Sequence, residues 1–276
     1  MKNILIPTDF SENSLNAIRY AVNLYKDAVC NFYILHVEAE IDNSESNLNN
    51  HSTVINVKKT SINRFLKDIV NQAKKEFTKN KKHHFFTIAN NDSLINAIRE
   101  QVLLKSIDLI VMGTKGVSGC TERTVGTNAG NVITKVKCNT LIVPENAKYV
   151  VPKKIAFPTD FSINYNIDTL QPITQLINEY KSEIELLHIS KKDLVLNESQ
   201  QRNIEYLEDY FAETEHSFHF LTHKKMENAI EEFVISKQVG LITMLAKNLN
   251  YFQHILFHPL AKEISYYKNI PFLVLH

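Results

Sequence analysis

Glycine, cysteine and long apolar runs are all scarce in this chain. Three cysteines, Cys30, Cys120 and Cys138, are an odd number without C-x-x-C spacing, so we expect reduced, ordinary thiols rather than a disulfide framework. No apolar run approaches the ~20 residues of a membrane span, and the N-terminal MKNILIPTDF lacks the long apolar core of a signal peptide. We therefore expect a cytoplasmic protein with no membrane partner.

An excess of charge of one sign is also missing. The 276 residues carry 31 basic and 30 acidic side chains, a formal net charge of +1. Nucleic-acid binders concentrate basic residues on one surface, so we expect no nucleic-acid partner. The hydrophobic fraction of 44% can supply real cores, which favours a soluble globular protein over a disordered one.

The sequence contains an internal repeat. KNILIPTDFS at Lys2–Ser11 recurs as KKIAFPTDFS at Lys153–Ser162, and DLIVMGTKG at Asp108–Gly116 lies over GLITMLAKN at Gly240–Asn248. Similar blocks in the same order indicate a duplication. We therefore expect two domains, residues 1–146 with a ligand loop and residues 151–276 as a degenerate copy.

Within each copy, short apolar runs alternate with segments of helical periodicity, one of which has Ser11 as its expected N-cap. Such alternation predicts an α/β fold whose parallel sheet is covered on both faces, and right-handed crossovers favour the doubly wound arrangements. In the first copy the expected strands are residues 3–7, 31–37, 84–90, 108–113 and 139–144, and the expected helices are residues 11–27, 52–77, 93–105 and 125–136.

Four of the six glycines fall within GTKGVSGCTERTVGT, Gly113–Thr127. This stretch joins the fourth strand to the next helix, at the sheet edge where open α/β sheets bind ligands. Glycine lets backbone amides approach an anion, and a helix N-terminus favours negative charge. We interpret the stretch as a phosphate cradle; the alternative is a flexible loop with glycine at its turns. It lacks the GK[ST] of a P-loop NTPase, and no GxGxxG follows the first strand.

The spacing Gly113-x2-Gly116-x9-Gly126-Thr127, together with IPTDFS and LHV, closely resembles the universal stress protein family, in particular its two-domain (tandem) members. The resemblance covers nearly the whole chain. It implies two five-stranded parallel sheets of Rossmann-like strand order 3-2-1-4-5, and ATP or AMP bound in the ATP-binding branch. Any Mg²⁺ would be held mainly by the phosphates.

The resemblance also implies roles for individual residues. Asp9 would bind the nucleoside, although an Asp at a strand end can instead serve the following turn. Val37 would read the adenine edge through its backbone, while amides and a hydroxyl at the start of the last helix would hold the phosphates. The complete predicted set is Pro7, Thr8, Asp9, Val37, Met112, Gly113, Gly116, Gly126, Thr127, Asn128 and Ala129.

The second copy has lost this cradle. Leu245, Asn248, His258 and Pro259 stand at the four key positions; side chains fill the approach to phosphate, and proline lacks an amide hydrogen. Asp160 persists and should serve its turn. We expect no nucleotide here. The loop of this copy is apolar and either fills its own cleft or contacts another surface; its apolar residues are Leu249, Tyr251, Phe252, Leu256 and Phe257.

Histidines outside the repeated motifs are expected to be ordinary packing or surface residues. His219 and His223 fall on one face of a strand, and His83 and His84 follow lysines in an expected solvated turn. No catalytic signature supports an enzyme. The leading hypothesis is a nucleotide-binding stress-response regulator whose two halves form an intramolecular pseudo-dimer. A scaffold that recruits a protein partner or a second copy, and a slow ATP hydrolase, stay open as alternatives.

Overall fold

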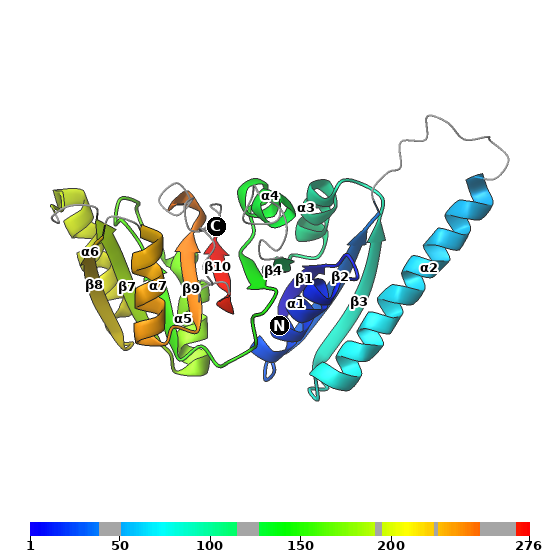
Figure 1. Ribbon diagram of the computed structural model, residues 1–276, viewed down its shortest axis with the longest axis horizontal. Coiled ribbons are helices and arrows are strands. Elements are labelled where there is room, and N and C mark those ends of the chain that lie inside the picture. Colours follow the sequence, from blue (N-terminus) through cyan, green and yellow to red (C-terminus); the bar gives the residue numbers. More distant parts are fainter. Residues whose placement is uncertain (39–50, 115–126, 191–194, 224–225, 249–268) are drawn as a thin grey trace. The chain divides into compact units, whose positions relative to one another are not determined.

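The computed structural model describes residues 1–38, 51–114, 127–190, 195–223, 226–248 and 269–276. The chain divides into two compact units, Met1–Gly113 and Thr114–His276 (Figure 1). In the described part of the chain, no helix is long and apolar enough to cross a membrane.

The first unit is an α/β unit built on a parallel sheet. The order of its strands is β3-β2-β1-β4, and every pairing in it is parallel. Its helix α2 lies against β3 (Figure 1). The elements are β1 (Lys2–Pro7), α1 (Glu12–Leu24), β2 (Cys30–Val37), α2 (His51–Gln72), the π-helical turn η1 (Ala73–Phe77), β3 (His83–Asn90), α3 (Leu94–Leu104) and β4 (Leu109–Thr114), whose last residue starts the second unit.

The apolar strands form because both faces of the sheet are covered. Ile4, Leu5 and Ile6, three successive residues of β1, are fully buried, as expected of a central parallel strand. Helix α1 begins where Ser11 accepts a hydrogen bond from the Ser14 amide, which satisfies one free donor of the first turn. Ser93 caps α3 in the same way. The predicted cap at Ser11 is confirmed.

The second unit repeats the architecture. Its strand order is β8-β7-β6-β9-β10-β5, in which β8-β7-β6-β9-β10 is the predicted 3-2-1-4-5 order, so the α/β fold class is confirmed. The elements are α4 (Thr127–Lys135), β5 (Thr140–Pro144), β6 (Lys154–Pro158), α5 (Ile167–Tyr180), β7 (Glu183–Ser190), α6 (Glu198–Phe211), β8 (His216–Thr222), α7 (Met226–Lys237), β9 (Leu241–Leu245), the 3-10 turn η2 (Ala246–Asn248) and β10 (Phe272–Leu275).

The last strands of the two repeats pair with each other. β5 and β10 run antiparallel, with Leu141 opposite Leu273, whereas the other pairings of the second unit are parallel. Every residue of both strands is buried. This pairing joins β5 to the second unit. A compact unit and a sequence repeat are different divisions of a chain, and the predicted domains, 1–146 and 151–276, stay a prediction.

The expected solvated turn at His83 is wrong. His83 begins β3 and is 7% exposed. Its Nε2–H donates to the Tyr25 carbonyl at 3.0 Å, and its Nδ1 pairs with the Thr78 hydroxyl at 2.7 Å. Burial lowers the pKa of His83, although the hydrogen bond to Tyr25 opposes the effect. The neighbouring His84 is exposed as expected, but it lies in β3 and not in a turn.

Candidate functional site

The PTDFS motif of the first unit forms a closed hydrogen-bonded turn at the carboxyl end of β1. The Thr8 amide donates to the Leu35 carbonyl at 2.8 Å, which holds the turn against β2. The Thr8 hydroxyl accepts from the Phe10 amide at 3.1 Å and pairs with the Ser14 hydroxyl at 2.9 Å. All the polar groups of the Thr8 side chain and amide are therefore used within the protein.

The phenylalanine of the motif has a strained backbone in both repeats. Phe10 has φ 65° and Phe161 has φ 57°, a left-handed conformation that bulky residues rarely adopt. Such a residue costs on the order of 1–3 kcal/mol and persists only where its surroundings determine it. Strained residues of this kind gather at functional sites, so the turn is a candidate site on backbone geometry alone.

A histidine at the end of the second strand supports each turn. His36 Nδ1 lies 2.8 Å from the Thr8 carbonyl oxygen, and its ring centroid lies 4.2 Å from that of Phe10. In the second repeat, His188 Nδ1 lies 3.0 Å from the Thr159 carbonyl oxygen. Burial lowers the pKa of His188, which favours the neutral ring. The Leu-His pair in both repeats was a signal for this role that the predicted site set does not use.

Asp9 is the charged residue of the first turn. Its Oδ1 accepts from the Ser11 amide at 3.1 Å and from the Ser11 hydroxyl at 2.5 Å, so the turn role is present. Burial raises the pKa of Asp9, but hydrogen bonds from Ser11 and Ser14 outweigh it, and the net pKa lies below its ordinary value. The residue stays exposed. Asp9 therefore presents an ionised carboxylate at the sheet edge.

Two further predicted residues, Val37 and Gly113, lie near the carboxyl ends of β2 and β4. β2 continues two residues beyond Leu35, the partner of Pro7, so Val37 lies past the end of β1. A Cβ on Gly113 would lie 2.6 Å from the Asn13 carbonyl oxygen. The glycine is therefore required by close packing of β4 against the first turn of α1, whatever its part in binding a ligand. Met112 precedes it and is buried.

The remaining predicted residues belong to the glycine-rich stretch and to the start of α4. Gly116 and Gly126 fall outside the described residues. Thr127, Asn128 and Ala129 begin α4 in the second unit. There Asn128 is exposed and Ala129 is 2% exposed. Their predicted contacts to phosphate stay a prediction.

The matching turn of the second repeat binds the protein's own side chains. Asp160 Oδ1 accepts from the Ser162 amide at 2.9 Å and the Ser162 hydroxyl at 2.7 Å, as predicted for a turn residue. It also accepts from the Asn248 amide group at 3.1 Å, and Asn248 is 6% exposed. Asn248 stands at the position of Gly116 in the first repeat. In the second repeat, the side chain of Asn248 is therefore hydrogen-bonded to the aspartate of the turn.

The segment before α5 and helix α6 supply further hydrogen bonds to this turn. The buried Tyr165 hydroxyl pairs with Thr159 Oγ1 at 2.5 Å, where the first repeat has Ser14, and burial raises the pKa of Tyr165. From α6, Gln200 donates to the Asp160 carbonyl and Asn203 donates to the Phe161 carbonyl, each at 2.7 Å. Side chains of the protein thus bind both the backbone carbonyls and the Asp160 carboxylate of the second turn.

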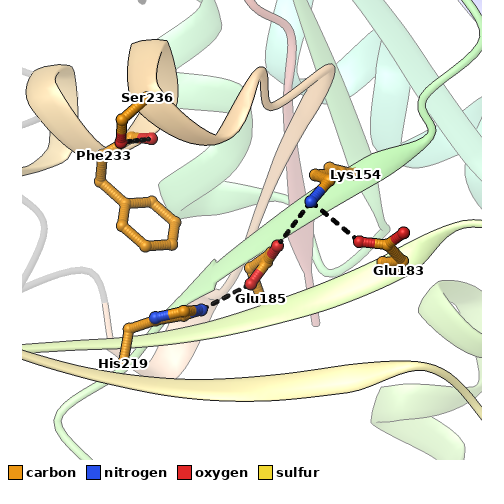
Figure 2. Close-up of polar contacts among 6 residues, drawn as sticks. All are labelled: Lys154, Glu183, Glu185, His219, Phe233 and Ser236. Carbon is orange, nitrogen blue, oxygen red and sulfur yellow. Dashed lines mark hydrogen bonds and ion pairs between the residues drawn. The ribbon is translucent and has the colours of Figure 1, made fainter.

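A polar cluster of the second unit joins side chains of β6, β7 and β8 (Figure 2). Glu185, whose side chain is 4% exposed, pairs with His219 Nε2 at 2.5 Å and with Lys154 Nζ at 3.3 Å, and Lys154 also pairs with Glu183 at 2.9 Å. Burial raises the pKa of Glu185, but the bonds from His219 and Lys154 outweigh it. The Phe233 ring of α7 lies edge-on to His219 at 5.0 Å. These contacts are those of a structural ion-pair network beneath a helix.

The order 3-2-1-4-5 and a polar turn at the carboxyl end of the first strand define a doubly wound α/β protein with its candidate site at the sheet edge. The sequence matches the universal stress protein family over residues 1–144. This match covers more than half of the chain, and the chain belongs to the universal stress protein family.

Solved structures agree with this fold over the full length. A universal stress protein from Archaeoglobus fulgidus DSM 4304 is 16% identical, with a TM-score of 0.65 over 99% of this chain and 97% of that chain. A protein from Pseudomonas aeruginosa UCBPP-PA14 is 12% identical, with a TM-score of 0.54 over 100% of this chain and 93% of that chain. No curated protein matches the sequence. At these identities the likeness shows the shared fold.

Proposed function

We propose that this chain is a regulatory protein whose first repeat alone binds an adenine nucleotide, ATP or AMP. The observation that carries the proposal is the contrast between the two PTDFS turns. Asp160 accepts a hydrogen bond from Asn248, whereas within the described part of the first unit the hydrogen bonds to the Asp9 carboxylate come from the nearby Ser11 and Ser14. The aspartate of the second repeat is thus bound by a side chain of the protein, whereas Asp9 of the first repeat is exposed.

The chemistry of Asp9 suits a nucleoside. Its pKa lies below the ordinary value, so the carboxylate is ionised near neutral pH and accepts hydrogen bonds. The hydroxyls of a ribose are donors, and a hydrogen bond to an ionised acceptor is about twice as strong as a neutral one. Val37 lies past the end of β1, where its backbone can meet the edge of a base.

The phosphate end of the nucleotide is assigned to the glycine-rich stretch. Gly116, Gly126 and the start of α4 would hold the phosphates through backbone amides, a chemistry for which helix N-termini are suited. Any Mg²⁺ would be bound mainly by phosphate oxygens. The residues that are described fit a nucleoside at Asp9 and Val37, and they include no group that we assign to hydrolysis.

Thermal unfolding with and without ATP or AMP tests the proposal. A ligand at 100 times its Kd adds about 2.7 kcal/mol to the unfolding free energy, which is a readily measured rise in Tm. Asp9→Asn keeps an acceptor for Ser11 and removes the charge, so it should reduce this rise. The matched Asp160→Asn should leave the rise unchanged.

The other hypotheses predict different results. A scaffold that does not bind nucleotide would show no rise in Tm for the unmodified protein. An ATP hydrolase would release phosphate at a rate that Asp9→Ala abolishes. A nucleotide-dependent rise in Tm without turnover supports the regulatory protein.

A further inference from the structure

The strained turn of the first repeat needs something to hold it. Phe10 has φ 65°, and its amide donates to the Thr8 hydroxyl, but these contacts leave the Thr8 carbonyl to be bound from outside the turn. That carbonyl oxygen lies 2.8 Å from His36 Nδ1. A residue from β2 therefore fixes the turn that carries Asp9.

The tautomer of His36 follows from this contact. A carbonyl oxygen only accepts hydrogen bonds, so Nδ1 must carry the hydrogen and donate it. The same ring stacks on Phe10, with centroids 4.2 Å apart and planes 30° apart. Phe10 in turn meets Phe65 of α2, with centroids 5.5 Å apart. His36 thus contacts both residues that flank Asp9.

We infer that His36 is a positioning residue for the nucleotide site of the first repeat. Its Nδ1–H holds the Thr8 carbonyl and its ring holds Phe10 in the left-handed conformation, so that the carboxylate of Asp9 between them keeps the orientation in which it meets the ligand. This inference rests on the proposed function. It assigns to His36 an effect on affinity that is separate from its effect on stability.

The second repeat supplies a matched control. His188 makes the same contact with the Thr159 carbonyl, at 3.0 Å, and its ring stacks on Phe161 with centroids 5.5 Å apart. The aspartate of that repeat is bound by Asn248. A change at His188 therefore disturbs an equivalent turn that has no part in the proposed binding.

Substitution of the histidine by asparagine or glutamine tests the roles of its two ring nitrogens separately. Asn carries its donor near the place of Nδ1, whereas Gln carries it near the place of Nε2. We would measure the Kd for ATP by titration calorimetry, and Tm without ligand, for the wild type, His36→Asn, His36→Gln and His188→Gln. His36→Gln should raise the Kd about tenfold, which corresponds to about 1.4 kcal/mol. His36→Asn should stay within about threefold of the wild-type Kd, because it keeps the bond to Thr8.

His188→Gln should lower Tm by an amount similar to His36→Gln but leave the Kd unchanged. A wild-type Kd for His36→Gln would overturn the inference, and so would an equal rise in Kd for His188→Gln. If the wild type itself does not bind ATP, the proposed function fails first. Should His36→Gln not fold, His36→Leu keeps an apolar side chain against Phe10 but has no donor for the Thr8 carbonyl, so it should raise the Kd in the same way; a wild-type Kd there overturns the inference.

Discussion

Gly113→Ala should destabilise the protein even when no ligand is present. The added Cβ would lie 2.6 Å from the Asn13 carbonyl oxygen and 3.0 Å from the Asn13 Cγ. Real Cβ atoms do not approach backbone so closely, so the first turn of α1 or the end of β4 must move. The backbone of Gly113 is not in the left-handed region, and the penalty is therefore one of packing.

The size of this effect follows from two opposing contributions. Overpacking costs about 1–3 kcal/mol, and the loss of glycine's freedom in the unfolded chain returns about 0.4–1 kcal/mol. The middle of these ranges gives a net loss of about 1.3 kcal/mol, which for a chain of this size lowers Tm by about 3–5 °C. Scanning calorimetry of the ligand-free protein measures it directly.

Gly240→Ala is the comparison for this experiment. Its Cβ would meet Pro152 Cα at 3.1 Å, a contact that a small shift relieves, so its Tm should fall by less. If the Tm of Gly113→Ala equals or exceeds that of the wild type, packing against Asn13 is not the reason for this glycine. The requirement would then come from the ligand alone.

Three further predictions concern stability. Burial lowers the pKa of His83 and His188, so the unfolded chain binds more protons and the unfolding free energy should fall below about pH 6.5; urea titrations at pH 7.5 and 5.5 should show the fall, and His188→Asn should reduce it. Glu185→Gln should cost about 1–3 kcal/mol at pH 7.5; because the pKa of Glu185 is lowered, this difference should shrink as pH falls below the ordinary Glu pKa of about 4.3, and an unchanged difference would contradict the pairing with His219. Ser93→Ala should cost about 1 kcal/mol of unfolding free energy through loss of the α3 cap, and no loss in thermal unfolding would contradict it.

The fold was largely predictable because it is encoded locally and twice. Apolar runs of five to eight residues between helical segments define parallel strands, and the recurrence of KNILIPTDFS as KKIAFPTDFS orders them. The expected strand at residues 31–37 is observed as Cys30–Val37, and the expected helix at 93–105 is observed as Leu94–Leu104. The antiparallel pairing of β5 with β10 was not predictable. Each is the last strand of its repeat, and nothing within a repeat determines which strand pairs with the outer side of that strand.

The candidate site was less predictable because its contacts are distant in sequence. Asn248 reaches Asp160 across 88 residues, and Gln200 reaches the same turn from α6. The residues that replace the glycines in the second repeat indicated that its phosphate site is lost. They did not indicate that Asn248 binds Asp160. The left-handed Phe10 and the bond from His36 depend on the three-dimensional turn, although the shared Leu-His pair pointed to the position.

The packing reason for Gly113 was also hidden from the sequence. Helix α1 begins at Glu12, whereas α5 begins at Ile167, four residues later than the aligned position 163. The second repeat therefore lacks the helical turn that carries Asn13 in the first. Leu245, which replaces Gly113 in the alignment, is 4% exposed. A delayed helix start and a larger residue thus occur together.

The stoichiometry of ATP binding tests the central claim most directly. Titration calorimetry should show one site per chain, weakened strongly by Asp9→Asn and unchanged by Asp160→Asn. Two equivalent sites per chain, or a single site that Asp160→Asn weakens and Asp9→Asn does not, would contradict the assignment of nucleotide to the first repeat.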